Sequence, residues 1–379
     1  MRKVIFALII VIAAVAVVGC NDNKEGNDIV YMWNIDDEEE LGRAGKMEKI
    51  EGLDDYEYIY GECYSDYQYS KLEENEKRFY KYIIYMAENG YNAIYIYNKN
   101  ALTEVMTQFE EAYFAVALDC PFVASSLGIK DVQSGNEYRA YIKNIMYKDE
   151  IARAYSFGQH VINEVKGKTE NSTDKEELVK KIYMSIIDET IYDDAQNDVL
   201  STLETKTANC DGISKTFEMI FNMVGVKTGV VTSETNSETG EGHAWNIVEF
   251  NGKYYYIDGT FGVSLRRDIK DFSNNAYMVS YKIPEEVMMS NKEYSIYCKV
   301  TEKIENDYSG FEGVIEEDAD INKVLDINEY EYASFYIDIN RENAYKVVTK
   351  LYNRLRENGY RYNAKLYDNQ VLVICIWKS

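Results

Sequence analysis

Apolar residues follow two spacings along this chain, and each spacing predicts a different element. Where they recur every three or four positions we predict helices, and where they alternate with polar residues we predict strands. In the first half of the chain, helices are predicted at 72–88, 103–118, 149–165 and from 173 onward, and strands at 91–97 and 138–146. Thr103 is the expected N-cap of the second helix, and Thr173 with Glu176 forms a capping box for the fourth.

The clearest pattern lies between residues 203 and 262. After Cys210, apolar residues recur on one helical face until Gly225 stops the helix; they are Ile213, Phe217, Ile220, Phe221 and Val224. Strands are predicted at 227–232, 243–250 and 253–257, and Asn251-Gly252 is a strong hairpin signal between the last two. The hairpin brings His243, at the start of one strand, beside Asp258, at the end of its partner.

Cys210, His243 and Asp258 have the side chains of a thiol nucleophile, its base and an orienting carboxylate. The thiolate is the reactive form of cysteine, and an adjacent imidazole can take the thiol proton. A carboxylate on the other ring nitrogen fixes the tautomer and orientation of the imidazole. The start of a helix favours a thiolate and an oxyanion, because the helix dipole and free N–H groups point there. Since the chain has only 2 histidines, His243 is the expected partner of Cys210.

Three short motifs carry a resemblance to a known family: Cys210-Asp211-Gly212, His243-Ala244-Trp245-Asn246 and Asp258-Gly259-Thr260. In their order and context they resemble the core of the transglutaminase-like superfamily, a branch of the papain-like thiol enzymes. The resemblance implies that Cys210 is the nucleophile, His243 the general base and Asp258 the orienting residue.

The same resemblance implies roles for two aromatic residues. Tyr192, in a Tyr-Asp pair, and Trp245 are expected to line the substrate or to help hold the oxyanion, although a tyrosine in a chain with 36 of them is also an ordinary core residue. The chain departs from the family at two places before the nucleophile. Many bacterial relatives have a glycine where this chain has Lys206, and a small or apolar residue where it has Asn209.

The expected fold class is α+β. The resemblance implies a transglutaminase-like, papain-like core in which a helix bearing the cysteine packs on an antiparallel sheet bearing the histidine and the aspartate. Flanking α+β domains are expected on both sides. The C-terminal one reads as β-α-β-β, with a strand at 332–339, a helix capped by Asn340 and strands at 360–367 and 370–377; the apolar helix face is Ala344, Val347, Val348, Leu351 and Leu355.

The N-terminus predicts a secreted, anchored protein. A basic start, Met1-Arg2-Lys3, precedes an apolar run from Val4 to Val18 that is short for a membrane span and has the flanks of a signal peptide. Its end, Gly19-Cys20, resembles a bacterial lipobox, which implies cleavage before Cys20 and lipidation of its thiol; an uncleaved anchor is the alternative. The expected division is a signal peptide (1–20), an acidic linker (21–55), a helper domain (56–165), a catalytic domain (166–290) and a C-terminal module (300–379).

The charge of the chain excludes some classes of partner, and its cysteines limit the possible disulfides and metal sites. The net charge of −24 argues against nucleic acid and anionic lipid surfaces, both of which would repel the chain. Cys63, Cys120, Cys298 and Cys375 can form two disulfides in any of three pairings or remain free, buried thiols. No cluster has the spacing of a zinc site, and no glycine-rich phosphate loop occurs, so neither a metal nor a cofactor is expected.

The sequence therefore predicts an extracytoplasmic, lipid-anchored thiol enzyme that attacks peptide bonds or glutamine carboxamides. Its expected partners are a protein or peptide substrate at the cell envelope and the membrane, reached through the N-terminal lipid. Hydrolysis is the favoured outcome, and transfer to a lysine amine is the other. A non-catalytic surface protein that binds or scaffolds with the same fold is the alternative from a different class, and an intact triad argues against it.

Overall fold

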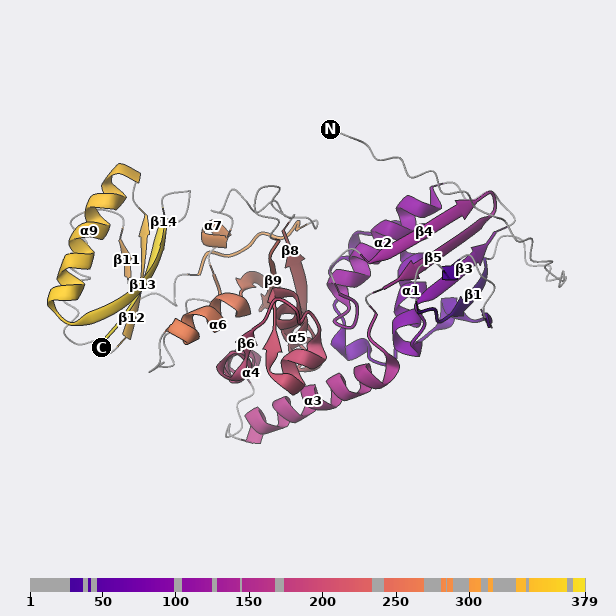
Figure 1. The fold of residues 1–379 in the computed structure, drawn as a ribbon, viewed down its shortest axis with the longest axis horizontal. Coiled ribbons are helices and arrows are strands. Elements are labelled where there is room, and N and C mark those ends of the chain that lie inside the picture. Colours follow the sequence, from indigo (N-terminus) through magenta and orange to yellow (C-terminus); the bar gives the residue numbers. More distant parts are fainter. Residues whose placement is uncertain are drawn as a thin grey trace.

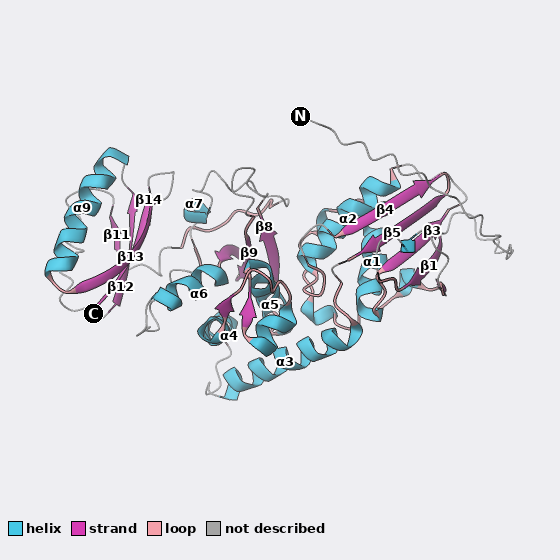
Figure 2. Cartoon of the chain, in the orientation of Figure 1, coloured by secondary structure: helices cyan, strands magenta, loops and turns pink. Residues whose placement is uncertain are grey.

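The structure is a computed structural model, and it describes most of the chain beyond residue 27. The described residues are 28–36, 40–41, 46–98, 104–124, 128–143, 145–167, 174–233, 242–268, 281–283, 285–288, 300–307, 313–315, 332–338, 341–366 and 371–378. Figure 1 shows an N-terminal region (28–143), a central region (145–268) and a C-terminal module (313–378). Helices and strands alternate irregularly around mostly antiparallel sheets (Figure 2), so the expected α+β class is confirmed.

The N-terminal region is an antiparallel sheet in the order β2-β1-β3-β5-β4. Its strands are β1 (Ile29–Trp33), β2 (Glu48–Ile50), β3 (Ala93–Tyr97), β4 (Ile129–Ser134) and β5 (Glu137–Ile142). Helices α1 (Glu74–Asn89) and α2 (Val105–Asp119) share one core with the sheet. Short 3-10 turns at Leu53–Asp55, Gly61–Cys63 and Tyr69–Lys71 link β2 to α1.

The expected acidic linker at 21–55 differs from the structure, because β1 and β2 are strands of this sheet. Val30 and Met32 are buried in the core that contains α1 and α2, whereas Trp33 is buried in a separate cluster with Tyr95. A strand buried on both faces appears as a short continuous apolar run. The run Ile29–Trp33 was not predicted as a strand, because acidic residues surround it.

The central region is built around one buried helix, α5 (Cys210–Met223), whose residues 211–221 are all buried. It packs against an antiparallel sheet in the order β10-β9-β8. Figure 1 shows the long helix α3 running beneath this region, and it contacts both α1 and α5. The remaining elements are α3 (Lys148–Gly167), α4 (Lys175–Glu189), β6 (Ile191–Tyr192), a π-helical turn (Ser201–Thr205), β7 (Thr207–Ala208), β8 (Thr228–Thr232), β9 (Ala244–Phe250), β10 (Lys253–Ile257) and α6 (Gly259–Asp268).

The predicted hairpin is present. Asn251 and Gly252 have φ angles of 53° and 77°, the left-handed pair that a tight two-residue turn between twisted strands requires. The register pairs Phe250 with Lys253 and Asn246 with Ile257, so the start of β9 and the end of β10 lie at the same edge.

The C-terminal module has the predicted β-α-β-β order and one further strand. β12 (Tyr332–Asp338), α9 (Arg341–Glu357), β13 (Tyr360–Leu366) and β14 (Val371–Lys378) follow the expected sequence, and β11 (Gly313–Ile315) pairs in parallel with β12. Of the expected helix face, Leu351 and Leu355 are buried, and the side chains of the other members lie outside the described set. A short helix, α7 (Glu285–Met288), precedes the module.

One predicted helix cap differs in the structure, and other predicted caps and the predicted signal peptide fall on residues that the structure does not describe. The N-cap of α4 is Asp174, whose carboxylate accepts a hydrogen bond from the Glu176 backbone N–H, so a cap one residue after Thr173 begins the helix. Thr103, Thr173 and Asn340 lie outside the described residues, as do the expected signal peptide and Cys20. Within the described residues, no helix has the length and apolar character needed to cross a membrane.

Candidate active site

Cys210 is the first residue of α5, as predicted, and Asn209 caps that helix. The Asn209 side-chain oxygen accepts hydrogen bonds from the backbone N–H groups of Asp211 (3.0 Å) and Gly212 (3.2 Å). The departure from relatives at position 209 therefore has a structural reason, since asparagine is among the strongest N-caps. This cap was not predicted, although its signal, an asparagine before an apolar helical run, is present in the sequence.

The other departure, Lys206, has a φ of 61°. In this left-handed region glycine has no steric cost and other residues are uncommon. The turn before Cys210 therefore keeps the conformation that a glycine would favour.

His243 and Asp258 lie side by side at the edge of the sheet. His243 Nε2 is 2.9 Å from Asp258 Oδ2, which leaves Nδ1 as the ring nitrogen available to Cys210. The other carboxylate oxygen of Asp258 accepts the backbone N–H of Phe261 at 3.0 Å, so Asp258 also begins α6. The Tyr183 hydroxyl of α4 donates to the Asp258 carbonyl at 3.2 Å. Both carboxylate oxygens of Asp258 are thus held, and its backbone is fixed by Tyr183.

The surroundings of His243 favour its protonated, positively charged form. Burial alone would lower the pKa of His243, but the Asp258 carboxylate, its hydrogen bond and a hydrogen bond with the Cys210 side chain raise it to about 10. An imidazolium beside a cysteine favours the thiolate over the thiol. The structure therefore brings Cys210, His243 and Asp258 together as one coupled group.

Trp245 packs against the ring of His243. Its indole is fully buried and stacks on the His243 ring with centroids 5.7 Å apart. A fully buried side chain cannot line a substrate, so the expectation for Trp245 is corrected to a packing role. The neighbouring Asn246 is also fully buried and donates to the Ser214 carbonyl of α5 at 2.9 Å, which fixes the sheet to the helix that bears Cys210.

Gly259 lets α6 start directly against α5. A Cβ at this position would lie 2.3 Å from the Phe217 ring and 2.5 Å from Ile213, both in α5. Only glycine permits this approach without displacement of the neighbours. Because Gly259 follows Asp258, the contact sets how far the Asp258 carboxylate lies from α5, the helix that begins with Cys210.

Tyr192 lies next to Cys210. Its strand, β6, pairs with β7 two residues before Cys210, and its side chain is 39% exposed. Burial, the nearby Cys210 and Asp194 raise the pKa of Tyr192, while a hydrogen bond with the Cys210 backbone lowers it. The hydroxyl thus lies at the backbone of the first residue of α5, an accessible position beside the thiol.

The N-terminal region also contacts the surroundings of Cys210, a contact that no sequence pattern predicted. Leu118 of α2 packs with Val230 and Ala244 in a small cluster that Cys210 touches. The buried ammonium of Lys215, in α5, donates to the carbonyls of Ala117 and Cys120 at the end of α2. No local sequence pattern predicts these contacts, because Ala117 and Cys120 lie 98 and 95 residues before Lys215 in the sequence.

The remaining cysteines offer no second centre in the described part of the chain. Cys63 and Cys120 are buried free thiols, and Cys210 is free and partly accessible. Cys298 and the side chain of Cys375 lie outside the described set. Among the residues that the structure describes, no group of three or more histidine, cysteine, aspartate or glutamate side chains could hold a metal ion.

Comparison with known proteins agrees with the resemblance in the three motifs. Residues 145–259 match the family model of the transglutaminase-like superfamily. The match begins at 145 and so includes α3, which the sequence analysis assigned to the helper domain. No curated protein matches this sequence.

Solved structures show distant similarity. A transglutaminase structure is 20% identical with a TM-score of 0.26 and covers 35% of this chain and 43% of its own. A candidate cysteine protease from Cytophaga hutchinsonii is 13% identical with a TM-score of 0.23, covering 35% and 61%. The periplasmic domain of TgpA from Pseudomonas aeruginosa is 14% identical with a TM-score of 0.24, covering 36% and 59%. The chain thus matches less than two thirds of each, and the assignment rests on the family model: residues 145–259 form a domain of the transglutaminase-like superfamily.

Proposed function

We propose that this chain is a thiol acyl-transfer enzyme with Cys210 as nucleophile, His243 as acid and base, and Asp258 as the orienting residue. The observation that carries the proposal is the hydrogen bond of 2.9 Å between His243 Nε2 and Asp258 Oδ2, made by an imidazole that also contacts a free cysteine at a helix start. Nucleophile, base and orienter within mutual reach are the signature of covalent catalysis on an acyl group.

The proposed reaction has two steps. The Cys210 thiolate attacks the carbonyl of a peptide bond or a glutamine carboxamide, and the backbone N–H of Cys210 with one further donor holds the oxyanion. His243 protonates the leaving amine as the carbon–nitrogen bond breaks, and a thioester remains. Water then resolves the thioester to an acid, or a lysine amine resolves it to a new amide. We favour hydrolysis, which makes the protein a cysteine protease or amidase.

The proposed setting is the cell envelope. The basic start, the apolar run and Cys20 support export and lipid anchoring of the N-terminus, and an anchored enzyme meets envelope proteins and peptides first. The partners proposed are therefore a protein or peptide substrate and the membrane that holds the lipid, without nucleic acid.

The test is the rate of Cys210 alkylation by iodoacetamide against pH, read by mass spectrometry, in the wild type and in His243→Ala. An activated thiolate should react well below pH 8, and loss of His243 should slow alkylation at pH 6 by roughly 100-fold, since an ordinary thiol has a pKa of about 8.5. His160→Ala is the matched control, because His160 is the other histidine and its side chain is 71% exposed.

An ordinary thiol profile in the wild type, unchanged by His243→Ala, would contradict the enzyme. That result would favour the other class, a surface protein that keeps this fold for binding, and pull-down experiments would follow. If the thiol is activated, peptide substrates with and without an added amine distinguish hydrolysis from transfer.

A further inference from the structure

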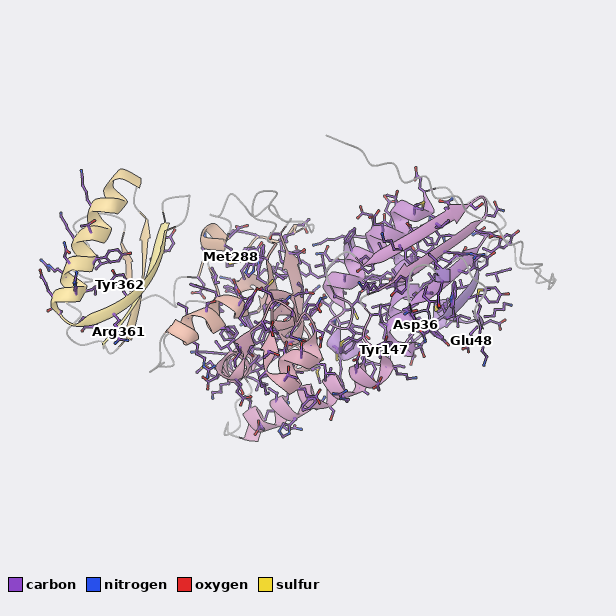
Figure 3. The ribbon with its side chains drawn as sticks, in the orientation of Figure 1. Asp36, Glu48, Tyr147, Met288, Arg361 and Tyr362 are labelled. Carbon is purple, nitrogen blue, oxygen red and sulfur yellow. The ribbon has the colours of Figure 1, made fainter. Side chains whose placement is uncertain are left out.

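A pocket of about 150 Å³ lies between the N-terminal and central regions. Other proteins accept a ligand the size of benzene in a cavity of about this volume, so one substrate side chain fits here. Tyr147, labelled in Figure 3, marks the place, because it directly precedes α3 and its backbone N–H donates to Glu150 of the pocket lining at 2.8 Å.

Both walls of the pocket belong to chain segments that also contact the start of α5, where Cys210 lies. On one side, the lining begins with Pro121, three residues after Leu118, which packs with Cys210. On the other side, Asn197 and Asp198 follow Gln196, whose carbonyl accepts the Asn209 backbone N–H at 2.7 Å. The Asp198 carbonyl oxygen is also within 3.0 Å of where a Cβ on Gly212 would be. The two walls are therefore anchored to the first turn of α5.

The lining combines apolar surface with negative charge. Its apolar members are Pro121, Phe122, Ala124, Ile145 and Met146. Its polar members are Glu150, Asn197 and Asp198, and both carboxylates are fixed by backbone N–H groups, Glu150 by Tyr147 and Asp198 by Ser201 at 2.8 Å. None of these described lining residues is basic. Two partly buried carboxylates beside apolar surface complement a flexible carbon chain that ends in a positive charge.

We propose that this pocket is a specificity site for a substrate residue with an aliphatic stem and a cationic end, such as lysine or another diamino acid. The proposal rests on the proposed thiol chemistry and names the kind of peptide on which it acts. The N-terminal region then supplies one wall of the substrate site. The net charge of −24 favours the approach of the same cationic peptides.

The test uses peptidyl chloromethyl ketones, which alkylate a nucleophilic cysteine after they bind in the substrate site. Matched tripeptide reagents carry lysine, leucine or glutamate at each position in turn, and the rate of Cys210 labelling is divided by the iodoacetamide rate of the same variant. This division separates binding selectivity from thiol activation. We expect lysine at one position to be preferred over glutamate by about tenfold or more, as expected of charge complementarity.

Two variants test the pocket. Glu150→Gln keeps an acceptor for the Tyr147 backbone N–H but removes the charge, and it should reduce the lysine-to-leucine ratio about fivefold, the effect of one partly exposed ion pair. Asp149→Asn is its control, because the exposed Asp149 is outside the pocket lining. Ala124→Leu fills the pocket and should slow the lysine reagent, whereas Ala152→Leu on the exposed side of α3 should not.

Two results would overturn the pocket proposal while leaving the thiol enzyme intact. One is a wild type that labels without preference for lysine at any position; the other is a lysine preference that Glu150→Gln and Ala124→Leu leave unchanged. Slow iodoacetamide alkylation of Cys210, by contrast, is the result that removes the proposed function itself.

Discussion

At the scale of single residues, Asp258 determines the geometry of the site. One oxygen of its carboxylate begins α6 through Phe261, and the other holds His243 Nε2. A capping carboxylate cannot rotate without loss of its helix contact, so the fold that makes α6 also orients the imidazole. The geometry of the His243–Asp258 pair is therefore also a consequence of helix capping.

The pKa of His243 provides a direct test at this scale. Because Asp258 raises the pKa, the stabilising pair is fully present below the usual histidine value of about 6.5 and is lost as pH rises through about 10. In Asp258→Asn the carboxylate charge is gone, so we expect His243 to titrate at least about two pH units lower, with slower alkylation of Cys210 at pH 7. NMR titration of the imidazole protons measures this directly.

The second histidine serves as the internal reference for the NMR spectra of the two variants. His160 is exposed and far along α3, so its signal should not move between the wild type and Asp258→Asn. A His243 that titrates below 7 in the wild type would contradict the charged pair.

At the scale of elements, local patterns predicted most of what positions the site. The helix after Cys210, the Asn251-Gly252 hairpin and the proximity of His243 to Asp258 all follow from periodicity and turn chemistry, which act over a few residues. β1 was not predicted, because acidic residues surround its short buried run. The capping role of Asn209 was not predicted either, although an asparagine before an apolar helical run is a helix-start signal. The burial of Trp245 could not be predicted, since the motif shows a residue type and not the side chain's surroundings.

The cap of α5 gives the prediction at this scale. Asn209→Ala leaves the backbone N–H groups of Asp211 and Gly212 without their acceptor, and we expect a loss of about 1 kcal/mol in the free energy of unfolding. Asn209→Ser retains an acceptor and should lose less than half of that. Denaturant unfolding measures both, and equal stability of the alanine and serine variants would show that the cap contributes nothing.

At the scale of the whole molecule, the N-terminal and central regions meet around a buried charge. Lys215 is 1% exposed, forms an ion pair with the buried Glu218 at 3.5 Å and binds the last carbonyls of α2. Cations at a helix C-terminus satisfy carbonyls that have no partner in the helix. A lysine in an apolar helical stretch gives no sequence signal of this role, because its acceptors belong to another region. The two regions should consequently unfold together.

Lys215→Met tests that coupling, because methionine keeps much of the side-chain volume and removes the charge. We expect a loss of about 3 kcal/mol, since a buried pair without one partner leaves an uncompensated group. Burial raises the pKa of Glu218 and Lys215 opposes this shift. An acid whose pKa is raised in the fold loses stability as pH rises through that value, so Lys215→Met should cost more at pH 8 than at pH 5.

The matched control is an ion pair that joins the same two regions at the surface. Lys227, which is 36% exposed, pairs with Asp66 at 2.7 Å, and Lys227→Met should cost less than about 1 kcal/mol, as is typical of exposed pairs. Unfolding followed by circular dichroism reports the whole chain. Alkylation of the buried Cys63 is the local probe of the N-terminal region, and loss of the fast alkylation of Cys210 at pH 6 is the local probe of the central region. Coincident transitions in the wild type that separate in Lys215→Met, but not in Lys227→Met, are the expected result. If both variants unfold like the wild type, the buried lysine does not join the two regions, and the wall that α2 places beside Cys210 must be held by apolar packing around Leu118 instead.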